Sequence, residues 1–275
     1  MTLGLFLLLT GTRLLATGMF TDGLVYDVVA RNMAEGIGSM WDPYYSATCW
    51  PHFREHPALS MWLLSLLYRL TGEGIWVAKA YSLLMLGLTM VLTLRLWHYV
   101  GGNNRTGWLP LMLLVMIEAI THFGISNILE VAMAPMVLGA VLLTLRASKA
   151  EHLWCGWLWL LAGGALLAGA FFTKGFTGLY PLAFPLMLAI VGYGPYGHGN
   201  FWNRAARTIT DTAYLALGLL LPVITIFLCN KQAWIFFIEY MQKQVLPGIE
   251  TPVADSRFYI ITALLIIFIF ISLIY

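Results

Sequence analysis

Long apolar runs recur along almost the whole chain, and most charged residues fall between them. A helix that crosses a bilayer needs about 20 mostly apolar residues. The chain is 60% hydrophobic and 10% charged, whereas soluble domains carry about 25% charged residues. The sequence therefore predicts an all-α integral membrane protein, a single polytopic domain over residues 1–275. Its eight predicted spans are 2–20, 75–99, 107–122, 128–146, 153–172, 176–193, 209–229 and 258–275.

Several functional classes are disfavoured by composition. A net charge of +2 is too small to suggest a nucleic-acid partner. Cys49, Cys155 and Cys229 form neither a metal-ligand cluster nor an even disulfide set. No His/Cys/Asp set has metal-ligand spacing, and no glycine loop is placed to bind a nucleotide, so we expect neither a metal nor a cofactor. Residues 1–20 lack a following small-residue cleavage site, so we interpret them as a first span rather than a signal peptide.

One further apolar run, "PALSMWLLSLLYRL" at 57–70, is too short for a span. We expect a helix at the membrane interface instead, beginning near Pro57, because proline suits the first turn of a helix. A long first outer loop, 21–74, then carries interfacial helices.

Lys and Arg predict which side each loop faces, since cytoplasmic loops are enriched in them. With the N-terminus inside, loops 100–106, 147–152 and 194–208 are cytoplasmic. These loops and their edges hold six basic residues, Arg95, Arg105, Arg146, Lys149, Arg204 and Arg207. Loops 21–74, 123–127 and 230–257 then face outward. A ninth span over 57–70 would reverse this pattern.

The stretch "FTDGLVYDVVARNM", Phe20–Met33, follows the first span. Val25, Val28, Val29 and Met33 share one face of a short amphipathic helix. Asp27 and Arg31 are spaced i,i+4, and we expect a structural pair on its wet face. Asp22 is a candidate N-cap of this helix and a candidate reactive carboxylate, and the two roles do not exclude each other.

Six further charged residues are candidates for function. Arg54, Glu55 and His56 form either a solvated turn or a polar cluster that faces the same pocket as Asp22. Glu130 begins an apolar span, where an acid either complements the helix dipole or marks a functional site. Lys174, in "TKG" between two apolar runs, either snorkels to the surface or awaits an anionic group at the depth of lipid phosphates. Arg257, in the last outer loop, is a weaker candidate for that anion.

These motifs, in this order, resemble the membrane glycosyltransferases of the C-type fold. The likeness is to bacterial relatives of protein O-mannosyltransferases and of the lipid A aminoarabinose transferase, a glycosyltransferase family 39-like group. Their first outer loop reads D-E-x-x-Y-x-x-x-x-R-x-M, followed by E-K-P or E-H-P. Here "DGLVYDVVARNM" supplies Asp22, Tyr26, Arg31 and Met33, and "EHPAL" supplies Glu55 and His56. Glu130 matches the acid of the second loop, and Thr173, Lys174 and Gly175 match the T-K-G corner.

The resemblance implies transfer of a hexosyl or pentosyl unit from a polyprenyl-phosphate donor to an acceptor hydroxyl. The site would lie on the outer face of a bacterial inner membrane, and the acceptor would be a lipid, a glycan or a protein. Asp22 is the expected general base. The expected substrate-binding residues are Lys174, His56, Glu55, Arg54, Glu130, Tyr26 and Arg31.

The sequence departs from the family at three positions. Gly23 replaces the second acid of the D-E pair, Glu130 replaces a more usual aspartate, and His56 replaces the lysine of many relatives. The family generally has more spans than eight, which implies either a fragment or a compact variant. Two other classes stay open, a transporter or flippase of a lipid-linked sugar and a non-catalytic membrane subunit. A transporter predicts polar residues in mid-span and on the cytoplasmic side, and these are few.

Overall fold

The computed structural model of the protein describes residues 2–250. Within that range the chain is helical, and the one β-type contact is an isolated bridge between Ser39 and Asp42. The all-α prediction is therefore confirmed for the described residues. The predicted span at 258–275 and Arg257 lie outside them.

The elements follow one another as a series of α-helices interrupted by two 3₁₀-helices (η1 and η2) and one π-helix (η3). They are α1 (Thr2–Leu15), α2 (Thr21–Ala34), α3 (Leu59–Thr71), α4 (Ile75–Tyr99), α5 (Trp108–Val115), α6 (Glu118–Phe123), α7 (Leu129–Ser148), α8 (Leu153–Lys174), η1 (Gly175–Ala183), α9 (Phe184–Ile190), η2 (Gly194–Tyr196), α10 (Phe201–Cys229), α11 (Lys231–Tyr240), η3 (Met241–Val245) and α12 (Leu246–Glu250).

Four helical stretches of the described chain are long and apolar enough to cross a membrane, so the predicted eight spans are not confirmed. Each of the four begins or ends within two residues of a predicted span. The fourth, α10, starts at Phe201 rather than 209, because Asn200 caps it by accepting a hydrogen bond from the backbone N–H of Asn203. The four stretches are Ile75–Tyr99, Leu129–Ser148, Leu153–Ile190 and Phe201–Cys229.

Two predicted spans are shorter or broken. The first helix, α1, ends at Leu15, and its 14 residues extend about 21 Å, less than the roughly 30 Å of a hydrocarbon core. The buried ammonium of Lys79 on α4 closes this helix by donating to the carbonyl oxygens of Arg13 at 2.9 Å and Leu14 at 3.1 Å. The predicted span at 107–122 is split into α5 and α6, because Ile117 between them has an extended backbone.

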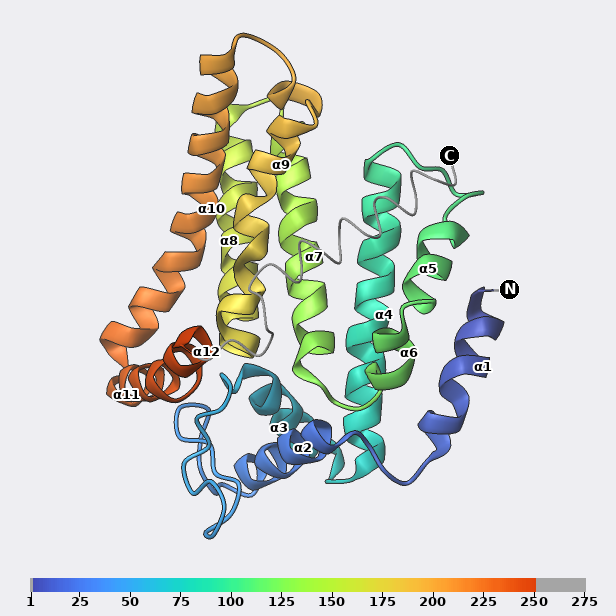
Figure 1. Ribbon diagram of the computed structural model, residues 1–275, viewed down its shortest axis with the longest axis vertical. Coiled ribbons are helices and arrows are strands. Elements are labelled where there is room, and N and C mark those ends of the chain that lie inside the picture. Colours follow the sequence, from blue (N-terminus) through green and yellow to red (C-terminus); the bar gives the residue numbers. More distant parts are fainter. Residues whose placement is uncertain (1, 251–275) are drawn as a thin grey trace.

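The predicted span at 176–193 is not a regular α-helix. Gly175, with φ +70°, ends α8 and turns the chain back, so η1 runs alongside α8 and α9 continues against α7 and α10 (Figure 1). Pro181 lies inside η1 and Pro185 opens α9. Proline lacks an N–H and its ring clashes with the carbonyl four residues earlier, so this segment does not continue as one α-helix.

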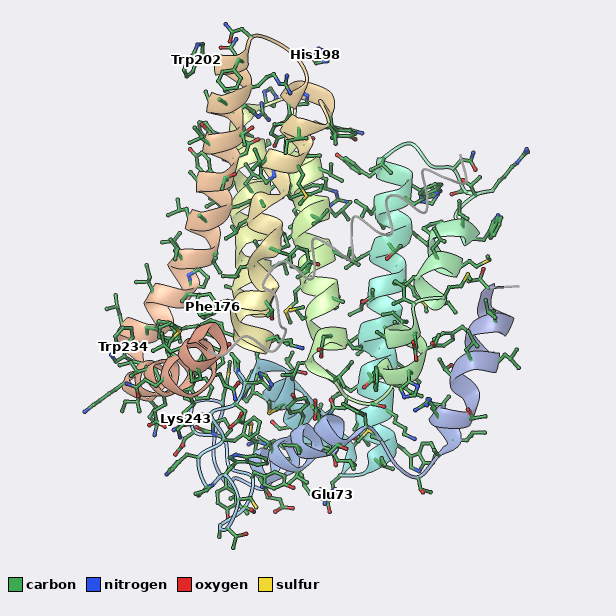
Figure 2. All side chains as sticks on the ribbon, viewed as in Figure 1. Glu73, Phe176, His198, Trp202, Trp234 and Lys243 are labelled. Atoms are coloured by element: carbon green, nitrogen blue, oxygen red, sulfur yellow. The ribbon has the colours of Figure 1, made fainter. Side chains whose placement is uncertain are left out.

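The loops gather at two opposite ends of the bundle (Figure 1). One end, which we call the α2–α3 end, carries α2, α3, the Lys174–Gly175 turn and α11. The other, the α9 end, carries 100–107, 149–152 and 191–200. Figure 2 shows Glu73, Trp234 and Lys243 at the first end and His198 and Trp202 at the second. Within residues 2–250, the loops predicted to share a side of the membrane thus share an end of the molecule.

The short helix α3 crosses the α2–α3 end. At its start, Leu59 packs with the apolar cluster of α7, α8 and α10. Further along, Met61, Leu64 and Tyr68 pack with Val29 of α2 and the first turns of α4. With 13 residues, α3 is about 20 Å long, too short to span. This placement seats α2 against the ends of the long helices.

Candidate functional site

Asp22 lies in the first turn of α2, with its side chain exposed. The N-cap position belongs to Phe20, and no side-chain capping hydrogen bond is formed there. The capping interpretation of Asp22 is therefore wrong, because the helix begins two residues earlier than that interpretation requires. A carboxylate in this turn is still favoured by the positive end of the helix dipole.

Gly23 explains how α2 and α7 come together. A Cβ atom at Gly23 would lie 1.7 Å from the carbonyl oxygen of Ser126, so only glycine permits this approach. Asn127, with φ +54°, donates from its backbone N–H to the Ser82 hydroxyl at 2.9 Å and from Nδ2 to the Gly23 carbonyl at 3.4 Å. Glycine thus replaces the second acid of the family motif, and the close contact that it allows brings the first turn of α7 near Asp22.

Glu130, in that first turn of α7, forms an ion pair with Lys174 at the end of α8. The pair is open to solvent, since the Lys174 side chain is 21% exposed and that of Glu130 53%. Next to it, a Cβ atom at Gly175 would lie 2.1 Å from the Tyr240 hydroxyl oxygen of α11. The tight Thr-Lys-Gly corner predicted from the sequence is confirmed, and the structure adds α11 as its cover.

His56 and Tyr26 lie edge to face, with ring centroids 6.0 Å apart. Burial and the Lys174 ammonium lower the pKa of His56, although Glu130 and Asp22 oppose that shift. Burial also raises the pKa of the Tyr26 hydroxyl, and the charges of Asp22, Glu130 and Glu55 add to the rise. His56 is thus disposed to be neutral and Tyr26 protonated near neutral pH.

These interactions define an acid–base cluster, whose members are Asp22, Tyr26, His56, Glu130 and Lys174. It combines elements far apart in sequence: α2, the turn before α3, the start of α7 and the end of α8. Glu55 borders the cluster, acting on Tyr26 and accepting a hydrogen bond from Gln244 Nε2 of η3. Six of the eight predicted site residues therefore lie together.

The structure does not bring the other two, Arg54 and Arg31, to the cluster. Arg54 is buried and pairs with Asp42 at 2.8 Å and Glu239 at 3.2 Å. Its guanidinium also lies 5.1 Å from the ring centroid of Phe236. Arg54 thus ties the loop before α3 to α11.

Asp42, the first partner of Arg54, also contacts His52 Nδ1 at 2.8 Å. Burial tends to raise the pKa of Asp42, but the hydrogen bond from His52 and the Arg54 charge hold it below its ordinary value.

Arg31 pairs with Asp27 at 3.4 Å and with Glu73 at 2.8 Å. The i,i+4 pair is confirmed, but its expected position on a wet face is wrong. Asp27 is buried, 4% exposed, and accepts a hydrogen bond from the Tyr68 hydroxyl of α3. Burial and Asp27 together raise the pKa of Tyr68. Asp27 faces α3 because α3 packs against α2 on that side, which periodicity within α2 alone does not reveal.

Sequence reasoning missed the residues that hold the site from the side of α11 and η3. Glu239 binds Arg54, Tyr240 covers Gly175, and Gln244 binds Glu55. Their segment combines aromatic and charged residues without a recognisable motif, and the only local signal is the polar run "EYMQKQ". Gln244 lies in the π-helix η3, and π-helical turns are frequent at functional sites.

The arrangement can do two things chemically. A solvent-exposed carboxylate can take a proton from a hydroxyl group, and a cation held by one exposed carboxylate can exchange it for a phosphate. Within residues 2–250, no group of three or more His, Cys, Asp or Glu side chains is placed to hold a metal ion.

Comparisons with known proteins show which solved structures share this fold. No protein-family model matches the chain, and no curated protein matches it significantly. Among solved structures, ArnT from Cupriavidus metallidurans in the apo state matches with 21% identity and a TM-score of 0.57, over 86% of this chain and 43% of that one. The same protein bound to undecaprenyl phosphate matches with 17% identity and a TM-score of 0.53, over 85% of this chain and 43% of that one.

ArnT is a lipid A aminoarabinose transferase of the C-type glycosyltransferase superfamily, the group that the sequence motifs resemble. This chain has an ArnT-like fold, and it spans less than half the length of the ArnT chain.

Proposed function

We propose that this protein is a membrane glycosyltransferase that uses a polyprenyl-phosphate-linked sugar as its donor. The observation that carries the proposal is the acid–base cluster, in which the charges of Asp22 and Lys174 both act on His56 beside the short helices α2 and α3. The fold supports it, because one of the matching ArnT structures is bound to undecaprenyl phosphate.

The reaction needs one base and one cation. The acceptor oxygen attacks the anomeric carbon of the sugar, and its proton passes to the Asp22 carboxylate. The bond between the anomeric carbon and the phosphate oxygen breaks, and its electron pair leaves with the polyprenyl phosphate. General-base catalysis of this kind contributes about 10²–10⁴-fold in rate.

Lys174 stabilises the charge that the phosphate gains. Its present partner, Glu130, is exposed, so a donor phosphate can replace it at little cost in buried charge. His56 adds a second cation when it is protonated. Tyr26, whose pKa is raised, keeps its proton and can donate a hydrogen bond to the sugar or the phosphate.

Glu55 is proposed to bind the sugar hydroxyls, with Gln244 fixing its orientation. Arg54 and Arg31 stay predicted substrate-binding residues. In the structure they bind carboxylates of the protein, and each would have to release one of them to reach a substrate.

We further propose that the α2–α3 end faces outward from a bacterial inner membrane. The basic loops lie at the α9 end, which favours the cytoplasm. The acceptor is a hydroxyl of a lipid, a glycan or a protein presented on the outer side.

A transfer assay with a panel of donors tests the proposal. The purified chain in lipid vesicles receives hexosyl and pentosyl polyprenyl phosphates together with lipid, glycan and peptide acceptors, and mass spectrometry detects glycosylated product. A glycosylated product with release of polyprenyl phosphate is expected. Donor binding or movement between leaflets without product would indicate a transporter or flippase. Neither binding nor product would indicate a non-catalytic subunit.

A further inference from the structure

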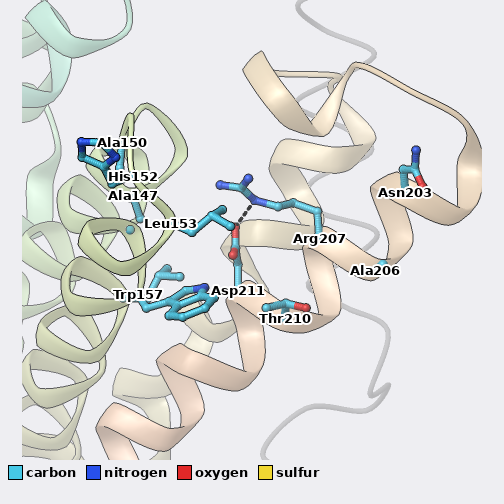
Figure 3. A pocket seen from close by; sticks show the side chains of 12 residues that line it. Ala147, Ala150, His152, Leu153, Trp157, Asn203, Ala206, Arg207, Thr210 and Asp211 are labelled. Atoms are coloured by element: carbon cyan, nitrogen blue, oxygen red, sulfur yellow. Dashed lines mark hydrogen bonds and ion pairs between the residues drawn. The ribbon is translucent and has the colours of Figure 1, made fainter.

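A second polar site lies at the α9 end, remote from the acid–base cluster. It is a cleft of about 720 Å³ between the end of α7 and the first turns of α8 and α10. Its size falls within the roughly 300–1,000 Å³ of small-molecule sites. Figure 3 shows His152, Leu153 and Trp157 on one side of it and Arg207, Thr210 and Asp211 on the other.

The cleft exists because α8 and α10 touch deeper in the bundle and part toward the α9 end. At the contact, a Cβ atom on Gly164 would lie 2.2 Å from the Leu215 carbonyl oxygen, and one on Gly218 would lie 2.3 Å from that of Leu161. Glycines thus fix the crossing. Toward the α9 end, small residues leave the space between the helices open, namely Ala147, Ala150, Gly156 and Ala206.

The two walls differ in chemistry. The α8 wall presents Leu153, Trp157 and Leu160, which are spaced as one helical face and are apolar. The α10 wall presents a polar stripe at the same kind of spacing, consisting of Asn203, Arg207, Thr210 and Asp211. A cleft with one apolar and one polar wall suits an amphiphile rather than a water-soluble molecule.

The charges in the cleft are balanced. Arg207 Nε donates to Asp211 Oδ2 at 2.9 Å, and the Tyr196 hydroxyl donates to the same oxygen at 2.6 Å. Asp211 is 3% exposed. An acid within a membrane-crossing helix is costly and is by default a candidate functional residue. The lining therefore offers one permanent cation and one carboxylate, with no surplus of either sign.

The depth of the cleft matches lipid head groups. Large aromatic side chains are exposed around it, including Trp154, Phe201 and Trp202. Such side chains mark the interface between membrane and water. The polar stripe of α10 begins at this level and runs inward from it.

We propose that this cleft binds a membrane phospholipid with a zwitterionic phosphoethanolamine head group. The phosphate accepts hydrogen bonds from the terminal N–H groups of Arg207, while Nε stays on Asp211. The ammonium donates to the Asp211 carboxylate and to the oxygens of Thr210 or Asn203. The acyl chains lie along Leu153, Trp157 and Leu160.

Two other head groups fit the lining less well. A purely anionic head group leaves Asp211 facing a like charge. A choline head group has no N–H to donate to Asp211. The inference does not rest on the proposed sugar transfer.

Native mass spectrometry of the purified chain tests the proposal. The protein is released from detergent after equal additions of phosphatidylethanolamine, phosphatidylglycerol or phosphatidylcholine with the same acyl chains. Retention of phosphatidylethanolamine is expected to exceed that of the other two about tenfold, the factor that corresponds to one charge-assisted hydrogen bond. Equal retention of the three lipids would overturn the proposal, as would a preference for phosphatidylglycerol.

A matched pair of variants locates the site. Ala206→Leu fills the cleft, leaves Arg207 and Asp211 in place, and keeps a good helix former in α10. Ala213→Leu makes the same change at an exposed position of α10 outside the cleft. Ala206→Leu should lose the phosphatidylethanolamine adduct while Ala213→Leu retains it. Unchanged binding by Ala206→Leu would place the lipid elsewhere and refute the site.

Discussion

Each end of the bundle holds one ion pair that bears on ligand binding, Lys174–Glu130 at the α2–α3 end and Arg207–Asp211 at the α9 end. The first joins two helices and is open to solvent, since Glu130 is 53% exposed. The second lies within α10, its carboxylate is 4% exposed, and the Tyr196 hydroxyl holds the same oxygen. The difference teaches that the exposed Lys174–Glu130 pair can exchange partners at little cost in buried charge, whereas the Arg207–Asp211 pair is held in place by the packing around its carboxylate.

The proposed orientation predicts an all-or-none difference in thiol labelling between the two ends of the bundle. In a variant that keeps only Cys49, a membrane-impermeant thiol reagent added outside intact cells should label this exposed residue of the α2–α3 end. A cysteine that replaces Asn103 at the α9 end, in a chain without the other three, should stay unlabelled until the cells are opened. The reverse pattern would refute the proposed orientation.

Replacing the proposed base should have the largest effect on chemistry. Asp22→Asn keeps the size of the side chain and removes its basicity, so transfer should fall by about 10²–10⁴-fold. Stability should change little, because Asp22 does not cap α2. Glu35→Gln, at the exposed C-terminal end of the same helix, is the control and should transfer normally. Near-normal transfer by Asp22→Asn would exclude the catalytic role.

Replacing the proposed phosphate cation should have the next largest effect. Lys174→Met keeps much of the aliphatic stem and removes the charge, so turnover should fall by roughly 10²–10³-fold, as for loss of one preorganised electrostatic partner. If Lys174 acts mainly as charge develops, kcat falls more than donor affinity. Lys174→Arg should keep partial activity, because its planar group places the donors differently. Unchanged kcat and KM in Lys174→Met would mean that Lys174 only snorkels.

Thermal unfolding distinguishes the two ion pairs directly. Arg207→Met leaves the buried Asp211 carboxylate without its cation and should cost on the order of 3 kcal/mol of stability. Glu130→Gln breaks the exposed pair and should cost about 1 kcal/mol or less. The measurement is the midpoint of unfolding in detergent, with Ala213→Leu as a control on α10. Equal losses for the two variants would contradict the distinction between rearrangeable and fixed charges.

The pH dependence of His56 should give the smallest effect. Its pKa lies below 6.5 because burial and Lys174 disfavour the charged ring. As pH falls below 6.5, His56 gains a charge that assists the phosphate, so transfer should rise a few-fold before other groups protonate. His56→Lys introduces the residue of many relatives and should lose this rise in transfer. If the rise persists in that variant, it comes from the titration of another group.

Stability should follow the opposite trend. The unfolded chain binds the His56 proton more readily than the folded one, so this contribution to stability is complete above pH 6.5 and is lost as pH falls. Unfolding midpoints of the wild type and of His56→Gln across that range give the check. An unchanged difference between the two proteins would show that His56 does not contribute.

The sequence by itself determined that this is a membrane protein and which charged residues its candidate site contains. Hydropathy predicts a membrane protein because burial in lipid needs long apolar runs, and α4, α7 and α8 match their predicted ranges closely. Motif order predicts the C-type fold, which the ArnT likeness bears out. The charged residues named from the sequence are also, for the most part, the ones that meet. Each of these properties resides in a short local stretch of chain.

Tertiary structure decided which of these residues act together. Asp22, Glu130 and Lys174 lie more than 40 positions apart from one another, and tertiary contacts such as that of Gly23 with Ser126, together with the turn at Gly175, bring them together. Asp27 follows the same local rules as an exposed acid, yet packing against α3 buries it. Local pattern encodes which side chains a helix carries. What those side chains face depends on where backbones from distant segments approach each other closely, and such contacts leave no local pattern in the sequence.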